Sequence, residues 1–411
     1  MAIIRPFRAL RPEESVAHQV ASVPYDVVNR EEAALYAKDF PFSYLRITRA
    51  EIEMDEKTNP YSKEVYLKAK ENLEKIRKQA PLKLEEKPCF YIYKLIMGEQ
   101  QQTGIAATFS VEDYDNNVIL KHERTRKEKE DDRTNHIITT EAQTGPVFLT
   151  YRAVKAIDEL VNETMNETEP IYNFTAPDGI KHIVWILPEE FNEVIISEIA
   201  KVKYLYIADG HHRAASASRA QKVKKESNSA HAGNEEYNYF LAVLFPADQL
   251  NIMPYNRVVF DLNGLKKEDF FEKIKDFFTI EETNCDVPSS RREISMYIDA
   301  KWYLLKPNSL VKQSNNVGDN LDVSILQSYL LTPVLGINDP RTDKRIDFIG
   351  GIRGTKELER LVNSGKAAVA FSMHPVSVYE LIDIADAGEI MPPKSTWFEP
   401  KLRDGLLVHL I

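Results

Sequence analysis

Apolar and polar residues recur along the chain with two periods, one typical of helices and one typical of strands. In the first half, an apolar stripe predicts a helix over residues 64–78, after a loop-rich start that contains Val23-Pro-Tyr-Asp-Val-Val-Asn29. The predicted strands of this half cover residues 89–95, 105–111 and 118–125. A very polar helix is expected next, over residues 126–142, and Gly145-Pro146 ends it.

The centre of the chain alternates between strand and helix patterns, which is typical of an α/β arrangement. The predicted strands cover residues 183–187, 204–208 and 239–245, and the predicted helices cover residues 190–201 and 213–227. Residues 226–236, rich in Ser, Asn and Gly, indicate a loop. No internal repeat is visible in the sequence.

A second region, with an α+β pattern, begins near Leu262. Its predicted elements are helices over 266–278, 323–335, 355–363 and 376–387, a hairpin over 294–305, a polar loop over 306–320, a strand over 367–372 and an extended segment over 391–396. At 411 residues the chain exceeds the size at which one hydrophobic core usually stops growing. We expect an N-terminal α+β region (1–110), a nucleotide-binding core (111–261) and a C-terminal α+β region (262–411) that completes a cleft.

Composition and charge narrow the class of protein. Apolar residues at 43% and charged residues at 28% are ordinary for a folded, water-soluble protein. A net charge of -10 argues against nucleic-acid binding, and the basic runs 121–129 and 222–225 are typical of solvated helix faces. Two cysteines, Cys89 and Cys285, exclude a disulfide framework or a Cys-rich zinc site and fit a reducing cytoplasm. The sequence shows neither a signal-peptide pattern nor an apolar run of about 18 residues, so no membrane insertion is expected.

The strongest candidate site is the junction Tyr204–Ala217, where an apolar strand meets Asp-Gly-His-His-Arg and an alanine-rich helix. The unpaired backbone N–H groups and positive dipole end of a helix bind anions, and Gly210 lets the backbone approach closely. The segment His211–Arg213 adds donors, and Asp209 has the chemistry to hold a metal ion or orient a histidine. The alternative is that Asp209 only caps the helix and that the histidines pack or face solvent.

A second candidate is the pair His122 and Glu123, at the end of the predicted strand over 118–125. A carboxylate in this position can take a proton from a substrate hydroxyl. An ion pair between Glu123 and the neighbouring Lys and Arg residues is an equal alternative.

A third candidate is Gly388–Thr396, in which two prolines precede Lys394, Ser395 and Thr396. A lysine with two hydroxyls suits a phosphate or carboxylate, although the segment by itself is more typical of a surface turn. Met253–Val258, and Tyr25-Asp26 with Asn29, are weaker candidates and more typical of structural positions.

At these residues the chain resembles the ParB/sulfiredoxin-like superfamily, and most closely its free L-serine kinases. The motifs shared with the kinases are Asp-Gly-His-His-Arg at Asp209–Arg213, an earlier His-Glu at His122-Glu123, and Gly-Glu followed by Pro-Lys-Ser-Thr at Gly388-Glu389 and Pro393–Thr396. Trp397 and Phe398 depart from the basic pattern of the archaeal kinases. The likeness covers the chain from about residue 110 to its end, and the whole chain is similar to a larger bacterial family often labelled ParB-like.

The resemblance implies a ParB/sulfiredoxin-like mixed-sheet nucleotide-binding core and a cytoplasmic, nucleotide-dependent kinase. The implied reaction transfers phosphate to the hydroxyl of a small molecule, with free L-serine giving O-phosphoserine as the leading reaction. ATP or ADP and Mg²⁺ are the expected cofactors. Sulfiredoxin chemistry would need a cysteine at the position of His211, and a DNA-partition protein would need a helix-turn-helix and a basic surface. The sequence has no cysteine at this position, shows no convincing helix-turn-helix pattern, and its net charge is negative.

The resemblance also implies a role for each motif residue. The residues implied to bind phosphate are Gly210, His211, His212 and Arg213. Glu123 is implied to be the catalytic base, assisted by His122 and Asp209, and Asp209 is implied to bind Mg²⁺. The residues implied to contact the transferring phosphate are Lys394, Ser395 and Thr396. A nucleotide-binding regulatory module without catalysis is the alternative. The nucleotide, the acceptor, the oligomeric state, a homodimer included, and the role of residues 1–110 stay open.

Overall fold

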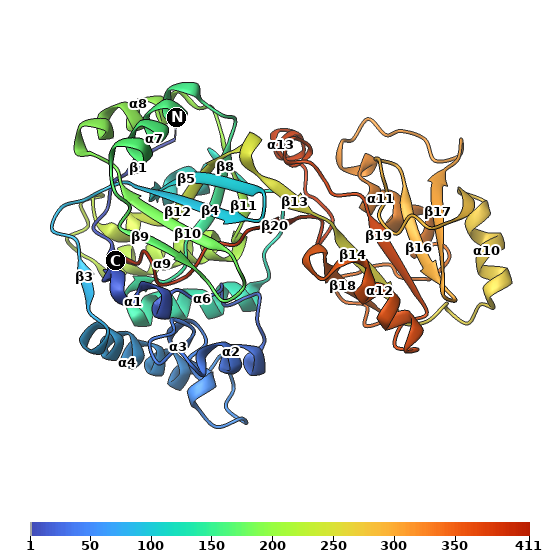
Figure 1. Cartoon of the computed structure of the whole chain (residues 1–411), viewed down its shortest axis with the longest axis horizontal. Coiled ribbons are helices and arrows are strands. Elements are labelled where there is room, and N and C mark those ends of the chain that lie inside the picture. The colour runs from blue at the N-terminus through green and yellow to red at the C-terminus, as the bar shows by residue number, and fades with distance from the viewer. Residues whose placement is uncertain (1) are drawn as a thin grey trace. The chain divides into compact units, whose positions relative to one another are not determined.

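The structure, a computed structural model, describes residues 2–411 and has two compact units (Figure 1). The first unit comprises the chain up to Leu250 together with Pro400–Ile411, and the second comprises Asn251–Glu399. This division differs from the predicted boundaries after residues 110 and 261. Strands on both sides of residue 110 pair in one sheet, and the C-terminal segment returns to the first unit.

A nine-stranded sheet forms the centre of the first unit, in the order β6-β11-β8-β12-β5-β4-β10-β9, with β1 beside β5. Its strands are β1 (Ile4–Arg5), β4 (Tyr91–Met97), β5 (Gln100–Ser110), β6 (Ile119–Leu120), β8 (Val147–Tyr151), β9 (Tyr172–Thr175), β10 (Lys181–Ile186), β11 (Leu205–Asp209) and β12 (Tyr239–Pro246). The β6–β11 and β8–β12 pairs are parallel, and the others are antiparallel. The predicted α/β class with a mixed sheet is confirmed.

Two short strand pairs tie the ends of the first unit together. They are β2 (Leu10–Pro12) with β3 (Leu82–Leu84), and β7 (Ala142–Gln143) with β21 (His409–Leu410). Val408 also pairs with Leu10, and Asp404 pairs with Ser22. The C-terminal segment is therefore held against the N-terminal segment by backbone hydrogen bonds.

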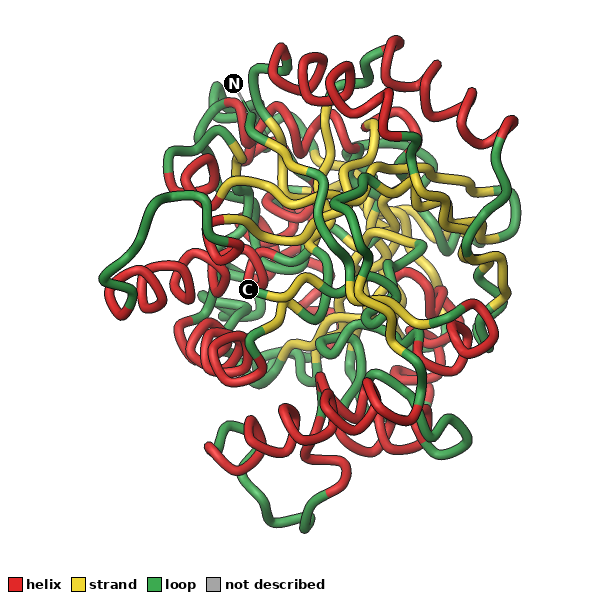
Figure 2. Tube along the Cα trace, turned by 90° about the vertical axis from the view of Figure 1, so that its left-hand side faces the viewer, coloured by secondary structure: helices red, strands yellow, loops and turns green. Residues whose placement is uncertain are grey.

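Helices cover the sheet and build a second, smaller core. They are α1 (Glu14–Val20), α2 (Arg30–Ala37), α3 (Leu45–Thr48), α4 (Lys63–Gln79), α5 (Val111–Asp115), α6 (Lys127–Thr140), α7 (Lys155–Glu167), α8 (Asn192–Lys201) and α9 (His211–Ser227). Figure 1 shows α7 and α8 above the strands and α6 below them. Helices α2–α4 lie lowest in this unit, and Figure 2 shows them in red at the bottom.

Residue spacing explains the two helices that matter most for the site. In α4, buried Val65, Ala69, Leu73 and Ile76 recur every three or four residues and pack with Val408 of the C-terminal segment. In α9, small residues replace a one-sided stripe: Ala214, Ala215, Ser216, Ala217, Ser218 and Ala220 are all buried. Because small side chains permit close approach on all sides, the first part of α9, up to Ala220, is buried within the unit beside α6 and the strands.

The second unit has an antiparallel six-stranded sheet in the order β15-β17-β16-β19-β14-β18. Its strands are β14 (Tyr255–Val259), β15 (Phe278–Thr283), β16 (Ile294–Ile298), β17 (Lys301–Pro307), β18 (Ile346–Gly350) and β19 (Val369–Met373), with the separate pair β13 (Asn251–Met253) and β20 (Trp397–Glu399). Its helices are α10 (Lys267–Lys275), α11 (Asp322–Leu326), α12 (Gly354–Asn363) and α13 (Val378–Asp386). This arrangement agrees with the predicted α+β pattern.

Four local predictions were wrong, at least in part. The strand over 118–125 stops at Leu120, because only Ile119 and Leu120 have ladder partners in β11. The loop-rich start contains α1, α2 and α3. The helix over 323–335 continues past α11 as a short π-helix, Gln327–Leu331. The segment over 391–396 is not fully extended, because Lys394 has a φ of 56° within a turn. Within residues 2–411, no helix is both long and apolar enough to cross a bilayer.

Gly405 tests how closely the C-terminal segment packs on Tyr44. Its φ is +87°, and a Cβ there would lie 2.6 Å from Tyr44 Cγ. We expect Gly405→Ala to lower the free energy of unfolding by about 2–5 kcal/mol, because left-handed strain adds to overpacking. Urea denaturation measures this loss. Gly98→Ala is the control, since Gly98 has a φ of +59° but no atom within 4 Å; equal losses would contradict the packing argument.

Candidate functional site

Two neighbouring parallel strands each lead, through a loop, into a helix at one edge of the sheet. β6 precedes α6 and β11 precedes α9, with Leu120 opposite Tyr206 in the ladder. Because parallel strands share a carboxyl edge, the two loops lie together. His212 Nε2 accepts a hydrogen bond of 3.0 Å from the backbone N–H of Arg126, just before α6. The positive dipole ends of α6 and α9 therefore meet at this edge.

The beginning of α9 has the features of an anion site. Gly210 takes the N-cap position with φ 92°, and a glycine has no side chain with which to cap the helix. A Cβ at Gly210 would lie 3.3 Å from Arg213 Cζ and Nε, so glycine lets the turn pack on this guanidinium. The uncapped turn presents backbone N–H groups to a ligand.

Arg213 is buried beside this turn, with 9% of its side chain exposed. One end of the guanidinium donates to the carbonyl of Pro146, while Nε and Nη2 find no hydrogen-bond partner within residues 2–411. Asp209 and Asp26 lie 3.6 Å and 3.8 Å from Nη2. Although burial disfavours the charge, these carboxylates raise the pKa of Arg213, so the guanidinium stays positive.

His122 and His211 form an edge-to-face pair with ring centroids 4.5 Å apart. Burial lowers the pKa of His122 to about 4, and burial also lowers the pKa of His211 well below its usual value. Both rings are neutral near pH 7 and each carries one N–H donor. Nε2 of His211 finds no hydrogen-bond partner in the described chain.

Glu123 lies at the rim of this cluster. Its Oε2 is 3.9 Å from His211 Nδ1, and 39% of its side chain is exposed. The structure thus brings His122, Glu123 and the segment Asp209–Arg213 to one place. A carboxylate beside an anion-binding turn can accept a proton from a bound hydroxyl compound.

Two residues from the C-terminal segment complete the cluster, and the sequence pattern did not identify either. Lys401 Nζ lies 3.1 Å from Asp209 Oδ2, and Asp404 is buried near Arg213. Burial alone would raise the pKa of Asp209, but the charges of Lys401 and Arg213 lower it below its usual range. The available signal was local: Pro400–Gly405 places charged residues directly before the apolar run Leu406-Leu407-Val408.

Lys394, Ser395 and Thr396 belong to the second unit. Lys394 Nζ donates to the Tyr255 hydroxyl at 3.3 Å, and the Lys394 carbonyl accepts from Arg257 at 3.1 Å. Ser395 Oγ donates to the Pro392 carbonyl at 2.7 Å. These contacts join the Gly388–Thr396 segment to Met253–Val258 within that unit, and the phosphate-binding role of its three residues stays a prediction.

Residues 4–324 match the family described as "Protein of unknown function (DUF1015)". The chain belongs to this family. No curated protein matches the chain.

Three solved structures are similar to this DUF1015 chain at low scores. Free serine kinase in complex with AMP is 10% identical, with a TM-score of 0.36 over 73% of this chain and 91% of that chain. SbnI from Staphylococcus aureus, with a C-terminal truncation, is 13% identical, with a TM-score of 0.39 over 74% and 87%. A conserved hypothetical protein from Pyrococcus furiosus is 11% identical, with a TM-score of 0.35 over 75% and 95%.

The residues at the turn fit a phosphate better than a metal ion. Uncapped N–H groups, Arg213 and the histidines are donors, which phosphate oxygens accept. A metal ion needs several ligands from oxygen, nitrogen or sulfur, and no group of three His, Cys, Asp or Glu side chains within residues 2–411 is placed to hold one. Asp209, predicted as the Mg²⁺ ligand, is already paired with Lys401 and Arg213. These surroundings do not fit a protein-held cation.

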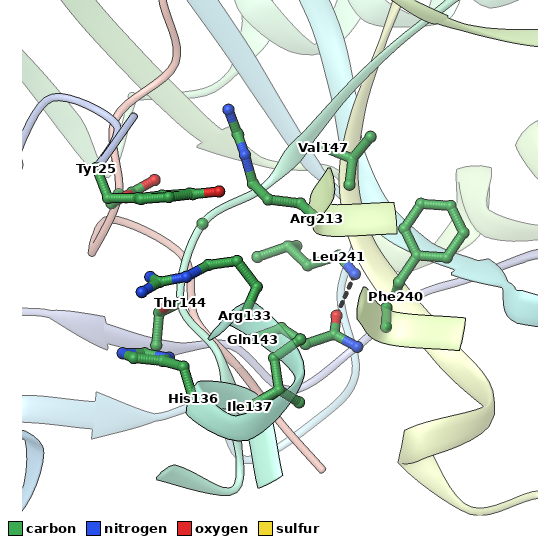
Figure 3. Close-up of a pocket in the computed structure, with 13 residues that line it drawn as sticks. Tyr25, Arg133, His136, Ile137, Gln143, Thr144, Val147, Arg213, Phe240 and Leu241 are labelled. Carbon is green, nitrogen blue, oxygen red and sulfur yellow. Dashed lines mark hydrogen bonds between the residues drawn. The ribbon is translucent and has the colours of Figure 1, made fainter. Parts of the chain in front are cut away.

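A small cavity of about 30 Å³ lies behind Arg213, with room for about two water molecules. Figure 3 shows Tyr25, Arg133 and Arg213 among its lining side chains. Asp404 also lines it, and Asp404 Oδ1 finds no hydrogen-bond partner in the described chain. Burial raises the pKa of Asp404 to about 7, even though Arg213 opposes the shift. A carboxyl group that changes charge near neutral pH therefore lies beside the candidate phosphate-binding arginine.

Asp404 makes the free energy of unfolding depend on pH, so that it falls as the pH rises toward 7. Since its native pKa of about 7 lies above the ordinary value of 3.8, the folded state holds this proton more tightly than the unfolded state. Its contribution to stability is full at low pH and is lost as pH rises from about 4 to about 7, by up to about 4 kcal/mol.

We expect Asp404→Asn to remove this dependence. Chemical denaturation of the parent and the variant at pH 5 and pH 8 measures it, because the difference between the two proteins cancels the other titrating groups. The variant should gain stability relative to the parent at the higher pH. Parallel pH profiles would show that Asp404 does not titrate in this range.

Proposed function

We propose that the beginning of α9 binds the phosphates of ATP or ADP and that the protein transfers a phosphoryl group to the hydroxyl of a small molecule, with free L-serine as the acceptor. One observation carries this proposal. A helix that begins at a glycine converges with Nε and Nη2 of buried Arg213 and Nε2 of His211, which have no hydrogen-bond partner in the described chain. Unpartnered buried donors cost free energy, so a site that keeps several of them is suited to a ligand that accepts hydrogen bonds.

The phosphates would lie against the backbone N–H groups of Gly210–Arg213. Arg213 offers the Nε–Nη2 edge of its guanidinium, a fork that suits two oxygens of one phosphate. His211 and His212 offer single donors. The adjoining start of α6 adds its own positive dipole end, which favours the charge of a nucleotide over that of a neutral ligand.

Glu123 is the proposed base. Its carboxylate takes the proton of the acceptor hydroxyl while the hydroxyl oxygen bonds to the terminal phosphorus. The bond between that phosphorus and its bridging oxygen breaks, and the electron pair leaves on ADP, or on AMP when ADP is the donor. Position supports this role, since Glu123 Oε2 lies 3.9 Å from His211 at the phosphate-binding turn.

Motif order supports the serine kinase assignment over other phosphotransferases. His122-Glu123, Asp209–Arg213 and Gly388–Thr396 occur in the order found in the free L-serine kinases, which the chain resembles at these residues. The first motif follows β6 and the second lies at the junction of β11 and α9, and the two are close together in the structure. Lys394, Ser395 and Thr396 are proposed to contact the transferring phosphate.

The reaction itself is the first test. Purified protein with ATP or ADP, Mg²⁺ and L-serine should yield O-phosphoserine, detected by mass spectrometry. Glu123→Gln should lower kcat by roughly 10²- to 10⁴-fold, because it removes the base but keeps the shape of the side chain. The affinity for ADP, measured by calorimetry, should change little. The kinase proposal would be overturned if the parent protein formed no O-phosphoserine, or if Glu123→Gln formed it at the same rate as the parent. Tight ADP binding without turnover would favour a regulatory module.

Gly210→Ala tests the turn separately from the base. The added Cβ would require a left-handed alanine and would press on the Arg213 guanidinium at 3.3 Å. We expect ADP affinity to fall by about tenfold or more, the equivalent of about 1.4 kcal/mol. Gly179→Ala is a matched control, because Gly179 also has a positive φ of +82° but no neighbouring atom within 4 Å. An unchanged ADP affinity in Gly210→Ala would mean that phosphates do not bind at this turn.

A further inference from the structure

One carboxylate oxygen at the turn is shared by two cations. Lys401 Nζ lies 3.1 Å from Asp209 Oδ2, and Arg213 Nη2 lies 3.6 Å from the same atom. The Lys401 side chain is 12% exposed and that of Asp209 is 30% exposed, so the pair lies at the edge of the buried cluster. Asp209 therefore fixes a lysine and an arginine next to the uncapped start of α9.

The charges around Arg213 show why a second cation matters. Asp209 lies 3.6 Å and Asp26 3.8 Å from Arg213 Nη2, and Asp404 lines the cavity beside Arg213. Asp209 and Asp26, joined by Asp404 when it is ionised, outnumber the single positive charge of Arg213. A phosphate approaching this guanidinium alone would meet a region with no net positive charge. Lys401 adds a second positive charge at the helix start and so offsets one of these carboxylates.

The backbone on both sides of Lys401 is held in place. The Pro400 carbonyl accepts from Gln102 Nε2 at 3.2 Å. Asp404 and Ser22 exchange backbone hydrogen bonds of 3.1 Å and 2.9 Å. Arg403 pairs with Asp178 and donates to His182 at 3.1 Å. A lysine on such a fixed segment loses less conformational entropy on binding a ligand than one on a mobile tail.

We propose that Lys401 is a phosphate-binding residue of this site and that Asp209 is its positioning residue rather than a metal ligand. The ligand is the terminal phosphate of a nucleoside di- or triphosphate, and the inference rests on the proposed function. Binding of phosphate beside Asp209 lets Lys401 contact both.

The test measures ADP affinity by calorimetry in the full chain. Lys401→Met keeps most of the apolar stem and removes the charge, and should weaken ADP binding by roughly 10- to 100-fold. Lys401→Arg keeps the charge and should restore most of the affinity. Lys87→Met is the control, because Lys87 also forms an ion pair, with Glu189 at 3.3 Å. This variant should bind ADP with the affinity of the parent.

A double-mutant cycle tests the role of Asp209. Asp209→Asn should weaken ADP binding in the parent and have much less effect in the Lys401→Met background, since a positioning residue acts through its partner. Equal effects in both backgrounds would show that Asp209 acts independently and would overturn its assigned role. Melting curves identify any variant that is unfolded, and Lys401→Gln then replaces Lys401→Met.

The outcomes separate the two proposals. If the parent binds ADP and the folded Lys401→Met or Lys401→Gln variant binds it equally well, Lys401 is not a phosphate ligand and the proposed function stands. If the parent binds neither ADP nor ATP, both proposals fail. If Lys401→Met binds weakly and Lys401→Arg does not recover, a purely structural role replaces the phosphate-binding role.

Discussion

The ion pair between Asp209 and Lys401 joins the beginning of α9 to the C-terminal segment, and the candidate site depends on this connection. Asp209 ends β11 and Gly210 begins the turn, so the carboxylate is placed by the sheet. Lys401 is placed by backbone pairing between the C-terminal and N-terminal segments. Arg213 shares the same carboxylate oxygen. Two distant parts of the chain, residues 209–213 and Lys401, therefore determine the charge at one helix start.

The fold provides this site through a simple geometry. Adjacent parallel strands deliver two loops to one edge of the sheet, and each loop leads into a helix. The loop after β6 carries Glu123, and the junction of β11 and α9 comprises Asp209–Arg213. The hydrogen bond between Arg126 and His212 brings the two helix starts together, so a base lies beside an anion-binding turn. Neutral, buried His122 and His211 keep the interior of this cluster free of additional positive charge.

Local sequence patterns predicted the parts of this site that depend on local structure. An apolar run, a glycine and a row of alanines indicated the strand, turn and helix of residues 204–227, which the structure contains as β11 and α9. Glu123 lies close to His211 because β6 pairs with β11. This long-range pairing involves only two residues of β6, and the periodicity of the sequence does not encode it. Lys401 and Asp404 were missed for the same reason, because their segment has no period and is placed by pairing with residues near the N-terminus. Helices α1–α3 were missed because short helices in a tightly packed cluster owe their stability to tertiary contacts rather than to a long apolar stripe.

The location of a bound nucleotide tests the central claim most directly. A crystal structure grown with saturating ADP should show the terminal phosphate at the start of α9, within hydrogen-bonding distance of the backbone N–H groups of residues 211–213. Nucleotide density elsewhere on the protein, with the start of α9 empty of phosphate, would contradict the account.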